Sequence, residues 1–345
     1  MNLNLWFVYR HMLRSRLFEG AVTVLWEQGL ISGEMHLGTG EEAIVAGVVL
    51  QLQDGDALAL DHRGTPPLLM RGVDPVLLLR EFLGQTGGLC HGMGGHMHLF
   101  APEYLAASSG IVGASGPAAA GFALAAQYLR PGRLAVAFFG EGAANQGMLM
   151  ESLNLAVAWR LPALFVCKDN QWEISTRAAS VTGGSLSERA RAFGMPALDV
   201  DGSDVEAVWA ASKTAMQRAH QGEGPTFLHA SCVHLQGHFL GDQLLRTAAK
   251  PLSELDTTTA MLKAFLRRSG APVKERVQGL SQLLSTISQA PTRRAIQDRD
   301  PLVAIRLKLA SDPAKLQQIE AEVSLEIQQY VEAALSPALA GEGSI

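Results

Sequence analysis

Two apolar segments of the chain, 134–139 and 161–167, each lead into a residue that can bind a cation. Glu141, between two glycines, follows the first segment, and Asn170 follows the second, 29 positions later. Short apolar runs of this kind are typical of buried strands, and the residues between them suffice for a crossover helix. In such a unit the strands lie parallel and end at the same edge of the sheet. We therefore expect Glu141 and Asn170 to lie close together.

The rest of the chain alternates between helical and extended patterns. Leu5, Val8, Met12 and Leu13 recur at helical spacing, which predicts an opening helix that packs on a neighbour or partner. This alternation predicts an α/β fold with a mainly parallel sheet and helices on both faces. Further helices are expected at 41–53, 74–85 and 117–129, from Ser203 onward, and at 302–309 and 316–334, with extended segments at 57–60 and 226–235.

The helix expected at 117–129 is rich in alanine and glycine. Side chains this small bury useful area only where another backbone approaches closely. We interpret this helix as a central or interface helix, or as one buried inside the monomer.

The residue types at the two strand tips suit magnesium. Mg²⁺ takes six oxygen ligands and borrows some of them from a phosphate group, so a protein supplies only a few. Glu141, the Asn170 side chain and the backbone carbonyl of Trp172 are the candidate metal ligands. This is a hypothesis, because a strand that ends in Gly-x-Gly is common in doubly wound sheets.

Gly140 and Gly142 allow a backbone to come close to a diphosphate, and a helix that starts near Ala143 would direct its N-terminus at the negative charge. A nicotinamide-binding fold is the obvious rival. However, Asn145 stands where the dinucleotide fingerprint has Gly or Ala, and no acidic residue follows about 20 positions later. The rival is weakened without being excluded.

Composition narrows the class of protein. The chain has 345 residues, of which 48% are hydrophobic and 35 are glycines, enough for one large α/β core or two modest ones. The net charge is −5 without a long basic run, so we expect neither a nucleic acid nor a membrane as partner. Three scattered cysteines form no metal or disulfide pattern, Glu19 and Glu27 interrupt any targeting pattern, and no apolar run spans a bilayer. We expect a cytoplasmic protein.

Several motifs together resemble one family. The run 140–147, followed by Glu151, Asn154 and the pair Asp169-Asn170, resembles the thiamine diphosphate motif in the alpha subunits of 2-oxo acid dehydrogenase first components. These include the pyruvate, branched-chain and acetoin-cleaving members. The segments 92–100, 110–114 and 225–238 resemble further parts of the same family, and the similarity runs from about residue 14 to 242 and resumes near residue 300.

The resemblance implies a thiamine-diphosphate-binding fold and a reaction in which the cofactor serves as the electron sink for decarboxylation of a 2-oxo acid. It also implies that the acyl group passes to a lipoyl carrier. The glutamate that contacts the aminopyrimidine ring comes from a separate beta subunit in this family, so we expect half of an active site and a heterotetramer. The implied cofactor-binding residues are Arg63, Gly113, Gly140, Glu141, Gly142, Ala143, Asn170, His234 and His238.

Two histidines are candidate catalytic residues. His238 matches a loop histidine that the family uses near the reacting centre, and His62 precedes Arg63, which matches an arginine that contacts the diphosphate. Near-neutral titration suits proton transfer. Without the resemblance, a loop histidine or a surface arginine is more often simply solvated.

The chain departs from the family pattern around this site. Glu141 stands where the family has Asp, His234 stands where it usually has an arginine that contacts the diphosphate, and Thr65-Pro66-Pro67 replaces a histidine-rich loop and stiffens the turn. These changes indicate either a divergent substrate or weakened catalysis.

The domain organisation follows from the same comparison. Residues 1–246 form the expected cofactor-binding domain with its N-terminal helical arm, and 299–345 are expected to close it with helices and a loose tail. Residues 247–298 exceed the family length and include helix-like pieces at 257–268 and 273–288. We interpret them as an insertion, either a surface excursion or a lid or docking surface.

Three functions are compatible with these observations. The first is the alpha subunit of an enzyme that decarboxylates or cleaves a 2-oxo acid or acyloin and passes the acyl unit to a lipoyl carrier; 62–64 and 237–242 favour an acetoin-like member. The second is a related two-subunit enzyme that loads a ketol or acyl unit onto a carrier protein in a specialised pathway, favoured by Thr65-Pro66-Pro67 and the insertion. The third is a non-catalytic scaffold or regulatory subunit, favoured by Glu141 and His234.

Overall fold

The computed structural model describes residues 2–174, 176–240 and 298–336, together with 272, 274–275, 277–279 and 281. Almost all of the expected insertion at 247–298, including the helical piece at 257–268 and most of that at 273–288, lies outside the described residues, as does the tail beyond 336.

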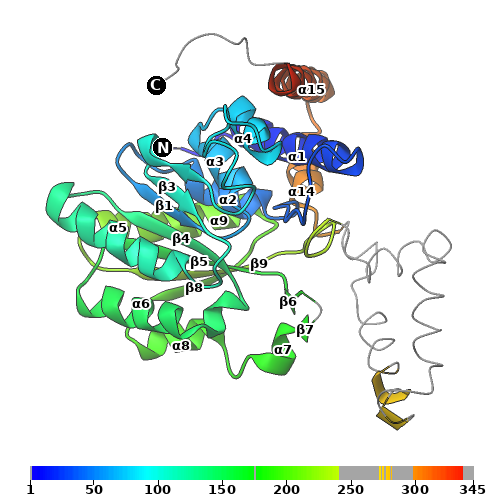
Figure 1. Ribbon diagram of the computed structural model, residues 1–345. Helices are drawn as coiled ribbons and strands as arrows, with labels where there is room; N and C mark the ends of the chain where they lie inside the picture. The colour runs from blue at the N-terminus through cyan, green and yellow to red at the C-terminus, as the bar shows by residue number, and fades with distance from the viewer. Residues whose placement is uncertain are drawn as a thin grey trace, which may run out of the picture.

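A seven-stranded sheet forms the centre of the fold (Figure 1). Its order is β2-β3-β1-β4-β5-β9-β8, and every pair of neighbours is parallel except β2 and β3. The expected α/β architecture with a mainly parallel sheet is confirmed. The strands are β1 (Ala57–Leu60), β2 (Phe100–Ala101), β3 (Ala106–Ser108), β4 (Ala135–Gly140), β5 (Ala163–Asp169), β8 (Ala197–Asp201) and β9 (Thr226–Ser231).

Helices cover both faces of this sheet, as expected. Along β4, Val136 and Phe138 belong to one buried cluster while Ala137 and Phe139 belong to the other, since successive strand residues point to opposite faces. The first cluster includes residues of α1 (Leu5–Glu27), α2 (Glu42–Val49), α3 (Thr65–Arg71), α4 (Pro75–Phe82), α9 (Val205–His220), α14 (Pro301–Lys308) and α15 (Pro313–Leu335); the second includes residues of α5 (Ser115–Leu129), α6 (Gly147–Ala158) and α8 (Leu186–Ala192).

The alanine-rich helix α5 packs closely on its neighbours. A Cβ atom added to Gly116 would lie 2.6 Å from Cδ1 of Leu149 in α6, so the two helix backbones approach as the composition predicted. Among the residues that the structure describes, contacts bury only one face of α5. Tyr128 and Leu129, near its end, are 76% and 78% exposed.

The first and last described helices pack together (Figure 1). α1 buries Val8 and Met12, and the hydroxyl of Tyr9 donates to Oε1 of Glu320 in α15 at 2.8 Å. The predicted opening helix is confirmed. The two predicted closing helices are observed as α14 and α15.

Three local predictions were wrong. Thr65-Pro66-Pro67 starts α3 rather than stiffening a turn, because proline fits the first turn of a helix without losing a hydrogen bond. The helix expected near Ala143 begins at Gly147, because a 3₁₀ turn over Ala143–Asn145 and an extended Gln146 come first. The extended segment expected at 226–235 ends at Ser231.

Candidate active site

Glu141 and Asn170 meet at the carboxyl edge of the sheet. β4 and β5 are parallel neighbours in a register that pairs Gly140 with Lys168, so both strands end at the same level. The backbone amide of Asn170 lies 3.4 Å from Oε2 of Glu141. The expected proximity of the two tips is therefore observed.

The Glu141 carboxylate is buried, with an exposed fraction of 2%. Its Oε1 atom has no hydrogen-bond partner among the described residues. Burial, followed by the nearby Asp169, raises the pKa of Glu141 to about 8. Because an unpaired buried carboxylate is costly, a cation at this position would offset that cost. The residues present therefore fit a metal-bound diphosphate.

The loop after β5 folds back on itself. Oδ1 of Asn170 accepts a hydrogen bond from the backbone amide of Trp172 at 2.9 Å, across Gln171 with its φ of 67°. Trp172 then enters the hairpin of β6 (Trp172–Glu173) and β7 (Thr176–Arg177), which sequence patterning missed because two-residue strands have no detectable period. Glu141, Asn170 and the Trp172 carbonyl as metal ligands stay predictions.

The glycines around the site differ in how much space a side chain would have at each position. A Cβ on Gly142 would lie 2.8 Å from Cγ of Glu173, whereas the atom nearest to a Cβ on Gly140, within the described chain, is 3.9 Å away. A side chain at Gly142 would therefore displace the Glu173 side chain, whereas Gly140 has space on its open side. Gly113, before α5, has a φ of 85°, which favours glycine. Ala143 lies in the 3₁₀ turn after Glu141.

A buried ionic network lies beside these tips. Nζ of Lys168 in β5 donates to Oε2 of Glu41 at 2.6 Å and lies 3.0 Å from Oδ2 of Asp61. Burial opposes the charge on Lys168, but Asp61 and Glu41 prevail and raise its pKa to about 12. Nothing in the residue pattern predicted this network, since a lysine near the end of an apolar strand usually marks the exposed tip.

His234 connects the network to the strand tips. Its Nε2 lies 2.8 Å from Oε1 of Glu41, and its Nδ1 lies 3.2 Å from Nδ2 of Asn170. Burial and then Arg63 lower the pKa of His234 to about 4, although Glu41 opposes this. The ring is therefore neutral near pH 7, unlike the arginine expected at this position in the family.

The buried Arg63 guanidinium holds the loop that contains His238. It donates to the backbone carbonyls of Leu37 and of His238, the latter at 2.8 Å, and its Nε lies 3.9 Å from Glu41. Contact between Arg63 and a diphosphate stays a prediction. In this arrangement Arg63 positions the loop from which His238 projects.

Four histidines gather beside Arg63. The ring centroid of His36 lies 4.7 Å from that of His62, 5.2 Å from that of His96 and 5.0 Å from that of His238. Burial lowers the pKa of His62 and of His96 to about 4 and that of His238 to about 3. The sequence identified His62 and His238 but missed His36 and His96, which lie in glycine-containing loops far away in the chain.

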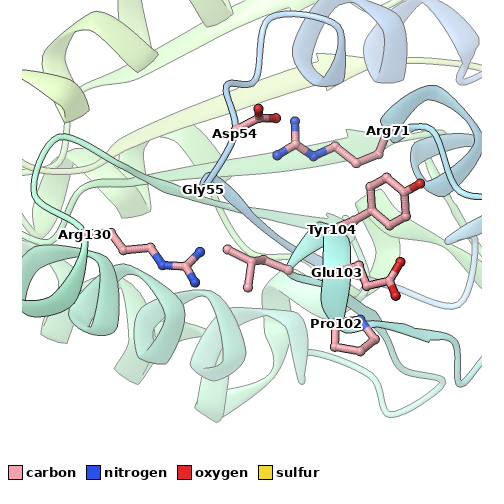
Figure 2. Close-up of a pocket in the computed structure, with 8 residues that line it drawn as sticks. Asp54, Gly55, Arg71, Pro102, Glu103, Tyr104 and Arg130 are labelled. Atoms are coloured by element: carbon pink, nitrogen blue, oxygen red, sulfur yellow. The ribbon is translucent and has the colours of Figure 1, made fainter.

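A surface pocket of about 440 Å³ lies elsewhere, where Gly55 leads into β1 at the amino edge of the sheet (Figure 2). None of the candidate site residues lines it. Its lining consists of Asp54, Gly55, Arg71, Pro102, Glu103, Tyr104, Leu105 and Arg130.

The fold and these strand tips agree with a family assignment. The family model for the dehydrogenase E1 component matches residues 10–303, and the chain belongs to this family. The family depends on thiamine diphosphate, so the expected recognition and cofactor class are confirmed.

More specific relatives are alpha subunits. The chain is 37% identical to the alpha subunit of acetoin:2,6-dichlorophenolindophenol oxidoreductase from Cupriavidus necator, over 84% of this chain and 88% of that protein. It is 38% identical to the subunit of the same name from Bacillus subtilis, over 74% and 78%. It is 37% identical to the pyruvate dehydrogenase E1 component alpha subunit from Zymomonas mobilis, over 78% of each chain. Similarity to alpha subunits implies a partner beta subunit.

Two further observations concern membrane-spanning helices and the cysteines. None of the helices in the described ranges is long and apolar enough to cross a membrane. Cys90, Cys167 and Cys232 are free thiols.

Proposed function

We propose that this chain is the catalytic alpha subunit of an enzyme that decarboxylates a 2-oxo acid or cleaves an acyloin and transfers the acyl unit to a lipoyl carrier. The names of its relatives and the family's thiamine diphosphate dependence support this proposal. The single observation that carries it is the meeting of Glu141 and Asn170 at one edge of the sheet. When bound, the cofactor supplies the electron sink for cleavage of the bond beside the carbonyl.

In this proposal Glu141, the Asn170 side chain and the Trp172 carbonyl bind Mg²⁺, which anchors the diphosphate. The unpaired Oε1 of Glu141, in the described part of the chain, supports that role. Gly140 leaves space for a close approach of the diphosphate, and Gly113 and Gly142 shape the backbone on either side. Ala143 offers its amide near the same place. In the same proposal His234 and Arg63 contact the diphosphate, and the His234 ring is neutral.

His62 and His238 are the proposed catalytic residues. Each ring is largely buried and neutral at pH 7, so each can accept a proton or donate a hydrogen bond at the reacting centre. Nε2 of His62 is buried and has no partner within the described ranges. A substrate oxygen could take that place.

The partner subunit supplies the glutamate that contacts the aminopyrimidine ring, so the site is complete only in a heterotetramer. Exposed apolar residues beside the N-terminus and at the C-terminus of α5, which are Ile111, Val112, Tyr128 and Leu129, support a subunit interface there. We place the enzyme in the cytoplasm, which its three free thiols support.

One alternative is favoured by a specific observation. α3 begins at Thr65, directly after Arg63 and Gly64, so no long histidine-rich loop follows Arg63. A two-subunit enzyme that loads a ketol or acyl unit onto a carrier protein would need different acid-base groups there.

Co-expression of this chain with its beta subunit tests the proposal. The complex is assayed with 2-oxo acids, acetoin and ketose phosphates, using an artificial electron acceptor, thiamine diphosphate and Mg²⁺. We expect turnover with a 2-oxo acid or acetoin that is lost in Glu141→Ala. Turnover only with ketose phosphates would select the alternative. A correctly assembled complex that binds the cofactor and turns over none of these substrates would leave a scaffold or regulatory role.

A further inference from the structure

Three histidines from distant segments converge beside the strand tips. His36 precedes α2, His62 follows β1, and His238 follows β9. One ring nitrogen from each lies within 4.8 Å of one ring nitrogen from each of the others. Zn–N bonds of about 2.0–2.1 Å place two ligand nitrogens about 3.4 Å apart. Side-chain rotations that move each ring nitrogen by about 1 Å would therefore close this cluster around one ion.

The rings are in the protonation state that metal binding needs. A metal binds neutral imidazole, and burial lowers the pKa of all three rings well below 7. Nε2 of His62 is buried without a partner in the described part of the chain, so its desolvation is uncompensated. An ion bound there would satisfy it.

His96 orients one of the three rings. Nε2 of His96 accepts a hydrogen bond from the backbone amide of His36 at 3.2 Å and lies 3.0 Å from Nδ1 of His36. Because Nε2 of His96 is already an acceptor, Nδ1 of His36 is the donor in the second contact. Nε2 of His36 therefore keeps its lone pair. This is the arrangement by which an outer partner fixes the tautomer of a metal-binding histidine.

We propose that His36, His62 and His238 form a binding site for a divalent transition-metal ion such as Zn²⁺, with His96 as the positioning residue. Three imidazoles with a fourth position open to water or substrate is a known arrangement for Zn²⁺. The site is separate from the oxygen ligands Glu141 and Asn170. The positive charge of Arg63, whose Nη2 lies 3.5 Å from Nδ1 of His238, opposes any cation here, so the site suits only an ion that bonds strongly to imidazole and does not suit Mg²⁺.

A second group of potential ligands nearby does not suit a metal. Glu41, Cys232 and His234 also offer ligand atoms within 4.8 Å of one another. However, Nζ of Lys168 lies 2.6 Å from Glu41, and burial raises the pKa of the Cys232 thiol well above its usual value. A cation there would meet an ammonium group and a protonated thiol.

The bound ion would inhibit the enzyme, and this part of the inference rests on the proposed function. Bound Zn²⁺ occupies the lone pairs that His62 and His238 need for proton transfer. It therefore inhibits turnover reversibly, and a chelator restores it. The binding itself is independent of the reaction.

Calorimetry on the complex of the full chain with its beta subunit tests the binding, in the presence of excess Mg²⁺ and without cofactor or substrate. We expect one additional Zn²⁺ per alpha chain, relative to a preparation of the beta subunit alone. Replacement of Zn²⁺ by Co²⁺ should give the visible absorption of a four-coordinate nitrogen site. His62→Gln and His238→Gln should each weaken binding at least about tenfold, and His96→Phe should weaken it about tenfold through loss of the orienting contact.

His91→Gln is the matched control, because His91 is exposed and lies outside the cluster. It should leave Zn²⁺ affinity unchanged. If His62→Gln fails to fold, His238→Gln, which changes a loop, carries the test. Zn²⁺ affinity that is equal in wild type and His238→Gln, or the absence of the additional ion, overturns the proposal. Glu141→Gln should lower cofactor binding while leaving Zn²⁺ binding intact, so failure of the proposed function is distinguishable from failure of this site.

Discussion

Nζ of Lys168 lies 2.6 Å from Oε2 of Glu41, and the two side chains are only 1% and 2% exposed. Glu41 precedes α2, whereas Lys168 lies in β5, so this buried pair ties the start of a helix to the central sheet. The same lysine reaches Asp61 after β1. The network therefore fixes three of the segments that surround the candidate active site.

Removing the lysine should destabilise the fold strongly. Lys168→Met leaves the buried Glu41 carboxylate without its ammonium partner, and loss of one member of a buried pair typically costs about 3–5 kcal/mol. Unfolding in denaturant measures the change. Arg191→Met, which removes exposed ion pairs with Glu188 and Asp199, is the control and should have little effect. Equal stability of Lys168→Met and wild type would mean that the network contributes nothing.

Asn170→Ala should weaken Mg²⁺-dependent binding of thiamine diphosphate by at least about tenfold, because it removes a proposed oxygen ligand and the hydrogen bond that folds the loop to Trp172. Calorimetry with the beta subunit present measures the affinity. Asn2→Ala, at an exposed carboxamide, should leave it unchanged. Unchanged affinity in Asn170→Ala would remove this residue from the cofactor site.

His238→Ala should lower kcat while leaving cofactor affinity nearly intact, because in the proposed function this ring transfers a proton and is not a ligand of Mg²⁺. Steady-state kinetics and cofactor titration separate the two effects. Arg63 donates to the backbone carbonyl of His238, which alanine retains, so the loop should keep its place. A variant as active as the wild type would exclude His238 from proton transfer.

Glu19 should make stability depend on pH. Burial raises its pKa from 4.5 to about 8, while the unfolded chain loses the same proton near the ordinary value. The unfolded state therefore binds fewer protons between these values, and stability falls as pH rises from about 4.5 to about 8.

Glu19→Gln keeps an acceptor for the amide of Gly38, which now donates to Oε1 at 2.8 Å. The variant should be more stable than the wild type by at least about 1 kcal/mol at pH 8 and nearly equal to it at pH 4. Thermal unfolding at both pH values checks this. A stability difference that does not change with pH would show that Glu19 does not titrate on unfolding.

Gly113→Ala and Gly121→Ala should change stability in opposite directions. Gly113 has a φ of 85°, and its added Cβ would lie 2.9 Å from Cβ of Gln146, so alanine is strained there. Gly121 lies within α5 and has space for a Cβ among the described residues, so alanine should stabilise the helix by about 0.5–1 kcal/mol. Denaturant midpoints compare the two variants. A stable Gly113→Ala would contradict the strain.

The meeting of Glu141 and Asn170 was predictable because each follows a continuous apolar run, and parallel strands of equal register end together. The opening helix was predictable for a similar reason, since its buried residues recur at helical spacing. Both predictions depended only on the local pattern of hydrophobic residues.

The histidine cluster was not predictable in the same way. His36 and His96 lie in loops, where no period exists, and they are 60 positions apart, so they meet only in the folded chain. Likewise, the charge on Lys168 gave no indication that two carboxylates from other segments would surround it. Contacts between residues far apart in the sequence form such sites. They can be predicted only once the order of the strands in the sheet is known.

The packing of α15 on α1 has a consequence for biosynthesis. Tyr9 and Glu320 are separated by 311 positions, so the part of α1 that packs on α15 stays uncovered during synthesis until α15 has been made, whereas α2 and α3 can cover other parts of α1 sooner. Over that interval a nascent chain exposes apolar side chains of α1, and a product that ended before α15 would keep them exposed. We therefore expect a version of the chain truncated before α15 to aggregate or to bind chaperones more readily than the intact chain does.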